Sequence, residues 1–291
     1  MDSISRRNFL KAGVVAGALA GVGTLHAERQ THASLVALGT SDVKVTRLAL
    51  GTGSFSGRTQ QQIGQDGLTQ LVHHAYDRGI RFFETAESYG QSQQMLAVAL
   101  KGIPRENYTL MTKVETVPGA DPRTKLDQLR RNSDTEYFDI MLLHWQHTAT
   151  WPEDTRHWQD AILEAQQKKT IRSHGASVHG LPALRRVPGT EWLQLAMIRM
   201  NHKGTRMDAE EHDADVLGNV SEVLEHVKQA RHAGMGIISM KLIGEGVFNH
   251  EDRQRAMRFA FKTAGVDSVT VGYKNTAEVD EAIDNINLAL A

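Results

Sequence analysis

The sequence has no cysteine, few prolines and no excess of charge of either sign, and each of these shortages excludes a class of protein. Without cysteine the chain has no disulfide, thiolate metal site, iron–sulfur cluster or cysteine nucleophile. Lysine and arginine number 33 against 34 aspartates and glutamates, so the net charge of −1 predicts no nucleic-acid partner. Only 6 prolines accompany 25 glycines, which excludes a collagen-like chain.

What remains is the composition of a folded soluble protein, with 40% hydrophobic and 23% charged residues among 291. Length alone allows two ordinary domains or one α/β barrel, which takes about 250 residues. Because the chain has 14 histidines, composition alone does not exclude a metal site. His144 and His147 stand close together, but no His-Glu-x-x-His motif accompanies them, so we predict no metal site.

The N-terminal segment has the pattern of an export signal. Ser5–Lys11 closely matches a bacterial twin-arginine signal, and the apolar run Ala12–Leu25 follows it. This run is too short to span about 30 Å of hydrocarbon. We therefore predict a signal peptide over residues 1–27, with cleavage after Ala27 or as late as Ala33; the alternative is a short N-terminal helix. The prediction implies the twin-arginine export machinery as a partner, no permanent membrane anchor and a periplasmic location.

Behind the signal, strand-like and helix-like segments alternate with little irregular sequence. Eight strands that are each followed by a helix are expected to run parallel with right-handed crossovers. Their nearly continuous apolar character indicates that both faces are buried. In a chain of this length the pattern favours a closed (β/α)8 TIM barrel over a doubly wound sheet. The strand-like runs are Val45–Gly51, Ile80–Thr85, Tyr108–Val114, Phe138–Trp145, Ile171–Val178, Trp192–Met200, Gly236–Leu242 and Val266–Tyr273.

Periodicity and capping signals place helices between these runs. Gly67–Arg78 and Val220–Ala233 repeat apolar residues at helical spacing. Residue pairs typical of helix starts mark further boundaries. These are Thr150 with Glu153, Asn219 with Glu222, Asn275 with Glu278, and Asp121 with Pro122.

The segment Ser34–Lys44 differs from the repeating units. Its turn residues, Gly39 to Asp42, predict an added N-terminal β-hairpin that covers the bottom of the barrel. With no internal boundary visible, residues 34–291 are predicted to form one barrel domain.

Polar side chains stand at the ends of three neighbouring predicted strands, where such a barrel carries its chemistry. Glu84 ends the second strand and Tyr89 follows it. Lys113 lies near the end of the third strand and His144 near the end of the fourth. A buried ammonium can lower a tyrosine pKa from about 10, because positive charge favours the phenolate. Such a tyrosine can protonate a developing alkoxide, while the carboxylate holds the lysine charged, which predicts carbonyl chemistry.

These residues also carry a resemblance to a known family. Phe83–Gly90 resembles the aldo-keto reductase signature around its catalytic aspartate and tyrosine, and Lys113 and His144 stand at the matching later positions. Leu38–Gly53 resembles the opening hairpin and first strand of that family, and the likeness spans most of the mature sequence. It implies NADPH-dependent interconversion of aldehydes or ketones with alcohols. On this resemblance Tyr89 is the proton donor, Lys113 lowers its pKa and His144 orients the carbonyl.

The resemblance also implies a set of NADP(H)-binding residues. Lys241 and the glycines after it are expected at the pyrophosphate, Lys274 at the 2′-phosphate and Glu281 at the adenine. The full set is Gly51, Thr52, Gly53, Ser177, Lys241, Gly244, Gly246, Lys274 and Glu281.

Several positions depart from the family pattern. Glu84 replaces the usual aspartate and adds one methylene to the arm that should reach Lys113. Val178 stands where an asparagine would bind the nicotinamide amide. Glu278 falls where a cation or glutamine is usual, and Ala282 replaces an expected asparagine. The chain therefore resembles a divergent member of the family.

A substrate pocket is expected around the same strand ends. Phe55, Trp145, His179 and Asn201 are predicted to line it, and the polar segment 202–218 to cover or flank its mouth.

Each assignment has a structural alternative. Lys113 and Glu84 could form a purely structural ion pair, and Tyr89 could be a core aromatic residue. His144 could be ordinary pocket lining, and Glu278 could simply cap a helix.

Two functions of different kinds remain open. One is a reductase that is exported with its cofactor and acts on a small-molecule carbonyl substrate. The alternative is a catalytically weak barrel that binds cofactor or ligand and serves as a periplasmic sensor or accessory protein. Binding of NADPH, and its oxidation by a generic aldehyde, distinguish the two.

Overall fold

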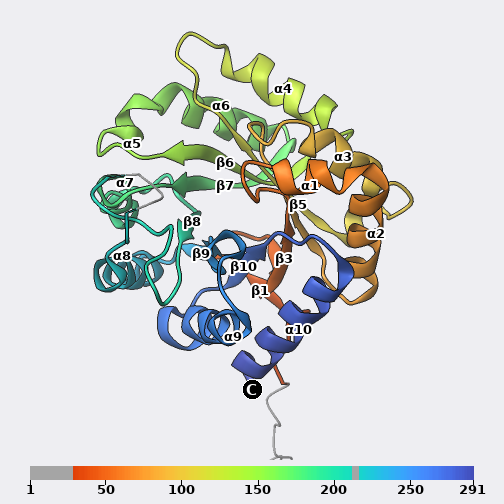
Figure 1. The fold of residues 1–291 in the computed structure, drawn as a ribbon. Coiled ribbons are helices and arrows are strands. Elements are labelled where there is room, and N and C mark those ends of the chain that lie inside the picture. The colour runs from red at the N-terminus through yellow and green to blue at the C-terminus, as the bar shows by residue number, and fades with distance from the viewer. Residues whose placement is uncertain (1–28, 212–215) are drawn as a thin grey trace, which may run out of the picture.

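The computed structural model describes residues 29–211 and 216–291, which form a closed barrel of parallel strands surrounded by helices (Figure 1). The strands follow one another around the barrel in the order β3 to β10, and β10 closes onto β3. The predicted (β/α)8 barrel is confirmed. The predicted signal peptide and residues 212–215 of the predicted mouth segment lie outside the described residues.

Each predicted apolar run corresponds to one barrel strand. The strands are β3 (Leu48–Gly51), β4 (Phe82–Glu84), β5 (Thr109–Val114), β6 (Phe138–Gln146), β7 (Ile171–Val178), β8 (Leu195–Arg199), β9 (Gly236–Met240) and β10 (Ser268–Val271). The prediction was wrong in one detail, because the run Val45–Gly51 is divided. Thr46 ends the hairpin, and its hydroxyl donates a hydrogen bond to the carbonyl of Leu48 at 2.8 Å, which turns the chain into the barrel.

The predicted N-terminal hairpin is confirmed and consists of β1 (Leu35–Ala37) and β2 (Lys44–Thr46), paired antiparallel. Its apolar side chains, including Val43 and Val45, join the cluster of residues that fills the barrel interior. The turn lies directly against the start of β9, since a Cβ on Gly39 would sit 2.2 Å from the backbone nitrogen of Gly236. Gly39 also has a φ of 56°, so glycine is required there by both space and conformation. The hairpin therefore closes the N-terminal end of the barrel.

Helices pack around the barrel and begin largely where the sequence predicts. The side chains of Asp121, Asn219 and Asn275 each accept a hydrogen bond from the backbone N–H three residues later, as expected. Thr150 does not cap in this way; its hydroxyl donates to Asp154 at 2.6 Å. No helix among the described residues is long and apolar enough to cross a membrane. The α-helices are α1 (Arg58–Gln62), α2 (Gly64–Asp77), α3 (Ser92–Ala99), α4 (Pro122–Asn132), α5 (Trp151–Asp154), α6 (Arg156–Gln167), α7 (Leu181–Leu184), α8 (Val220–His232), α9 (His250–Arg258) and α10 (Thr276–Leu290).

Side chains alternate between two apolar layers, and this alternation positions the site. Phe82, Met111 and Leu142 face the barrel interior, whereas their chain neighbours pack outward against the helices. Two residues farther along each strand, the same inward register reaches Glu84, Lys113 and His144. The apolar interior therefore ends in a layer of polar side chains at the C-terminal mouth.

Candidate active site

A buried lysine lies at the centre of this polar layer. Lys113 has a fully buried side chain and forms an ion pair with Glu84, whose side chain is 3% exposed. The Lys113 ammonium also donates to the carbonyl oxygen of Thr85 at 3.0 Å and to the hydroxyl of Tyr89 at 3.1 Å. All three of its N–H donors thus have an acceptor, so its direction toward Tyr89 is fixed.

The electrostatics of this group follow from burial. Desolvation, with a smaller effect of the Lys241 charge, lowers the pKa of Lys113 well below its usual value. The carboxylate of Glu84 acts in the opposite direction and is the group that can hold Lys113 as an ammonium ion. Burial first and Glu245 second raise the pKa of Tyr89. The lowered tyrosine pKa expected from the sequence is therefore wrong: burial outweighs the neighbouring ammonium, and the phenol keeps its proton.

His144 lies beside the tyrosine. Its ring stands edge-on to the ring of Tyr89, with centroids 5.6 Å apart, and its Nδ1 is 3.0 Å from the hydroxyl of Ser88. Burial first, then the charges of Lys113 and Lys241, lower the pKa of His144 well below its usual value. A neutral imidazole can donate only one N–H, so it can act as a hydrogen-bond donor but carries no charge near neutral pH.

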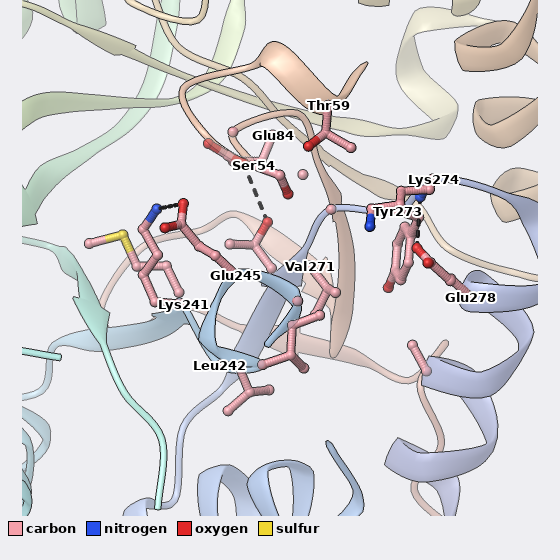
Figure 2. A pocket seen from close by; sticks show the side chains of 18 of the residues that line it. Ser54, Thr59, Glu84, Lys241, Leu242, Glu245, Val271, Tyr273, Lys274 and Glu278 are labelled. Carbon is pink, nitrogen blue, oxygen red and sulfur yellow. Dashed lines mark hydrogen bonds and ion pairs between the residues drawn. The ribbon is translucent and has the colours of Figure 1, made fainter. Parts of the chain in front are cut away.

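A cavity of about 160 Å³ connects Tyr89 with the start of α10. Figure 2 shows Glu84 with Ser54 on one wall, Lys241 with Glu245 on another, and Lys274 with Glu278 beside α10. Glycine keeps space open near the tyrosine, because a Cβ on Gly53 would lie 2.6 Å from the Tyr89 ring. The predicted residues that line the cavity are Gly51, Gly53, Phe55, Glu84, Tyr89, Lys241, Gly246, Lys274 and Glu281.

The other predicted residues lie around or behind this cavity. Thr52 is buried, and its hydroxyl donates to the carbonyl oxygen of Glu84 at 3.1 Å. Ser177 is also buried, with its hydroxyl 3.3 Å from Nε2 of His179. Gly244 begins a short turn after β9 and has a φ of 59°. Asn201 is fully buried, and its amide donates to the carbonyl oxygens of Thr205 in its own loop at 2.7 Å and of Lys241 after β9 at 3.3 Å.

The mouth carries an exposed tryptophan. Trp145 is 48% exposed and has a left-handed φ of 54°, at an irregularity in the pairing of β6 with β7. Its ring packs against that of His147, with centroids 4.5 Å apart and the two planes tilted by 38°. His179 is the next imidazole along the mouth, 6.3 Å from His144 between ring centroids. These side chains give the mouth an aromatic and imidazole character.

At the far end of the cavity, two acidic side chains are already paired. The backbone N–H of Glu278 donates to the side chain of the N-cap residue Asn275 at 3.0 Å, as the structural alternative predicts, but its carboxylate accepts the backbone N–H of Lys274 at 2.8 Å and not that of Asn275. Glu281 accepts two hydrogen bonds from Arg253, at 2.8 and 3.0 Å, and one from His250. Arg253 also lines the cavity. It supplies a cation at this end that sequence reasoning missed.

Other charged residues of the site were missed as well. Arg199 ends β8 at an inward position and pairs with the buried Asp208 at 2.7 Å. An arginine at an inward position of an apolar strand was the available signal. Arg206 and Glu245 lie in loops, and no periodicity marks them.

Comparison with known proteins shows the family. A model of the aldo/keto reductase family matches residues 47–256, and a model of the twin-arginine translocation signal matches residues 3–23. A probable aldo-keto reductase from soybean is 28% identical over 237 residues, which cover 75% of this chain and 62% of the soybean protein. An L-galactose dehydrogenase from Arabidopsis thaliana is 26% identical over 238 residues, covering 76% of this chain and 69% of that protein.

Solved structures share the fold. A putative aldo-keto reductase from Pseudomonas aeruginosa superposes with a TM-score of 0.72 at 20% identity, covering 91% of this chain and 99% of that one. An aldo-keto reductase from Bacillus halodurans in its holo form gives a TM-score of 0.68 at 17% identity, covering 88% and 95% of the two chains. Together with the family model, the barrel and its polar mouth lead to one conclusion: the chain belongs to the aldo/keto reductase family.

Proposed function

We propose that this protein reduces an aldehyde or ketone to an alcohol, with hydride from NADPH and a proton from Tyr89. The observation that carries the proposal is the 3.1 Å contact between the buried Lys113 ammonium and the hydroxyl of Tyr89, which lines the same cavity as Lys274. The family of the chain, whose members oxidise and reduce carbonyl compounds, supports the reaction class.

The residues along the cavity fit a dinucleotide. Gly51 and Gly53 leave room beside Glu84 and Tyr89 that a Cβ would fill. Lys241, Arg253 and Lys274 supply cations along the wall, as an elongated ligand with several phosphates requires. When bound, the nicotinamide supplies the hydride. The protein supplies position, charge and the proton.

Proton transfer is the step that this chain performs itself. As negative charge develops on the carbonyl oxygen, the Tyr89 O–H bond breaks and its proton moves to that oxygen. Lys113 stabilises the phenolate that results, and Glu84 keeps Lys113 charged. The N–H of neutral His144 donates a hydrogen bond to the same oxygen and orients the carbonyl. The raised pKa of Tyr89 keeps the phenol protonated until the charge develops.

We propose NADPH over NADH on the basis of Lys274, which lies at the cavity end beside α10. The relatives differ on this point: one is named an NADH-specific methylglyoxal reductase, from Escherichia coli, and another a glycerol 2-dehydrogenase (NADP+), from yeast. The preference of this chain for NADPH or NADH is therefore argued from its own residue Lys274.

We also propose that the folded barrel, residues 34–291, is exported to the periplasm by the twin-arginine pathway. The matching signal model over residues 3–23 supports export. This pathway carries folded proteins, which suits a protein that binds its cofactor before it leaves the cytoplasm.

The experiment that tests the function is direct. The purified mature protein is mixed with NADPH and an aromatic aldehyde such as nitrobenzaldehyde, and the loss of NADPH absorbance is followed. Steady oxidation with one alcohol formed per NADPH supports the reductase. Tight NADPH binding without turnover, across a panel of aldehydes and ketones, supports the ligand-binding alternative instead.

A further inference from the structure

One carboxylate on the cavity wall links its own loop to two others. Glu245, whose side chain is 9% exposed, forms ion pairs with Lys241 and with Arg206, the latter at 3.3 Å. Its Oε1 also accepts the backbone N–H of Phe55 at 3.3 Å. Phe55 follows β3, Arg206 follows β8, and Lys241 and Glu245 follow β9. Figure 2 shows Lys241 and Glu245 pointing toward each other at the cavity.

All four residues of this cluster have an unusual backbone. Their φ values are 50° for Phe55, 51° for Arg206, and 55° for both Lys241 and Glu245. The left-handed region is unfavourable for residues other than glycine, and such residues gather at ligand clamps and switches. The three loops are therefore held in strained conformations around a single carboxylate.

Phe55, Lys241 and Glu245 of this cluster lie on the wall that the proposed cofactor must pass, whereas Arg206 pairs with Glu245 without lining the cavity itself. Lys241 and Glu245 line the same cavity as Tyr89 and Lys274. This inference rests on the proposed function, in which a dinucleotide reaches from Tyr89 to Lys274. Its diphosphate is the anionic part between those two ends.

Charge decides whether Glu245 and a diphosphate can share this position. Lys241 and Arg206 bring two positive charges and Glu245 one negative charge, so the cluster has one net positive charge. A diphosphate linkage carries two negative charges. With the carboxylate in place it meets a like charge in a partly buried site, whereas with the carboxylate moved out the two cations neutralise it.

We infer that Lys241, Arg206 and the Phe55 N–H form an anion site for a diphosphate, which the chain's own Glu245 carboxylate occupies until the ligand displaces it. Glu245 keeps the three loops together and the two cations paired in the absence of ligand. The ligand must break these contacts to bind, so the cost of breaking them offsets part of the free energy that the ligand gains from the two cations. Removing the charge of Glu245 removes this competition.

The test is Glu245→Gln, which keeps the shape of the side chain and removes its charge. Binding of NADPH and of inorganic pyrophosphate is measured by calorimetry for wild type and variant. We expect both dissociation constants to fall about tenfold in the variant, within the usual range of such couplings. Glu251→Gln is the matched control, since Glu251 forms an exposed pair with Arg255 and its loss changes the net charge equally. That control should bind both ligands as wild type does.

If Glu245→Gln weakens binding of NADPH and pyrophosphate, or leaves it unchanged, the carboxylate is not a competitor and the inference is wrong. Should the variant fail to fold, Arg206→Gln removes a cation instead and should weaken pyrophosphate binding about tenfold; unchanged binding would contradict the site.

The inference and the proposed function fail separately. A wild type that reduces aldehydes with NADPH, together with a Glu245→Gln variant that binds no tighter, leaves the function standing and overturns the inference. A variant that gains affinity for pyrophosphate, in a protein that reduces no carbonyl compound, overturns the function and leaves the anion site standing.

Discussion

Shortening Glu84 to aspartate tests the proton-donor system at the residue where this chain departs from its family. Glu84 reaches Lys113 with one carboxylate oxygen, and its other oxygen lies 3.4 Å from the hydroxyl of Thr270. The site is built around the longer arm, because Gly51 leaves space for it: a Cβ there would lie 2.8 Å from Glu84 Oε2. Glu84→Asp should therefore withdraw the carboxylate from Lys113.

The size of the effect follows from Coulomb's law. Removing one methylene lengthens a contact of about 3 Å by about 1.5 Å. At an effective dielectric constant of about 20, the attraction falls from about 5.5 to about 3.7 kcal/mol. If this loss of about 1.8 kcal/mol is fully expressed on the charged form of Lys113, and hence on the transition state, turnover should fall about 20-fold.

The assay is kcat for aldehyde reduction at saturating NADPH, with circular dichroism to show that the variant is folded. Glu164→Asp provides the control, because it shortens an acidic side chain that pairs with Lys168 on the surface of α6. It should leave kcat unchanged. An increase in kcat for Glu84→Asp would contradict this expectation, since it would show that the longer arm marks a decayed site rather than an adapted one.

Three further predictions concern stability, cofactor choice and export. Burial lowers the pKa of His174 to about 4, so the unfolded chain takes up the proton first and stability present above about pH 6.5 is lost as the pH falls toward 4. The full loss is about 3.4 kcal/mol for this residue, of which about 1.8 kcal/mol falls between pH 7 and pH 5, so the free energy of unfolding of His174→Gln should decline less by about that amount over this range; an unchanged decline would remove His174 as the cause. Lys274→Ala should raise the dissociation constant of NADPH more than that of NADH, whereas equal weakening would show that Lys274 does not contact the 2′-phosphate. Changing Arg6 and Arg7 together to Lys should leave a folded, unprocessed precursor in the cytoplasm, as shown by fractionation; normal periplasmic accumulation would argue against the twin-arginine pathway.

The barrel and the residues at its mouth were predictable because the same periodicity of the strands determines the fold and the direction of the side chains. Glu84, Lys113 and His144 follow apolar residues at inward positions, so an alternating pattern places them in the same layer. The order of strands then follows from the parallel topology. The hairpin was predictable from its turn residues, but its boundary with β3 was not, because the hydrogen bond of the Thr46 hydroxyl decides it.

Electrostatics and loops could not be predicted in the same way. The pKa of Tyr89 depends on burial and on Glu245, which is distant in sequence and reaches the cavity from another loop. The pairing of Glu245 with Arg206 joins two loops whose residues have left-handed backbone conformations. Neither residue type favours that conformation, so the sequence does not predict it. Glu281 is a further example: the resemblance places it at the adenine, but in the structure it forms an ion pair with Arg253.

Replacing Tyr89 by phenylalanine removes the proposed proton donor itself. The variant removes only the hydroxyl that Lys113 contacts at 3.1 Å, so folding and NADPH affinity should stay close to those of wild type. The hydroxyl acts as charge develops on the carbonyl oxygen, so its loss should lower kcat, by about 10²–10⁴-fold on the scale of general acid catalysis. A Tyr89→Phe variant that binds NADPH normally and reduces aldehydes as fast as wild type would contradict the assignment of Tyr89 as the proton donor.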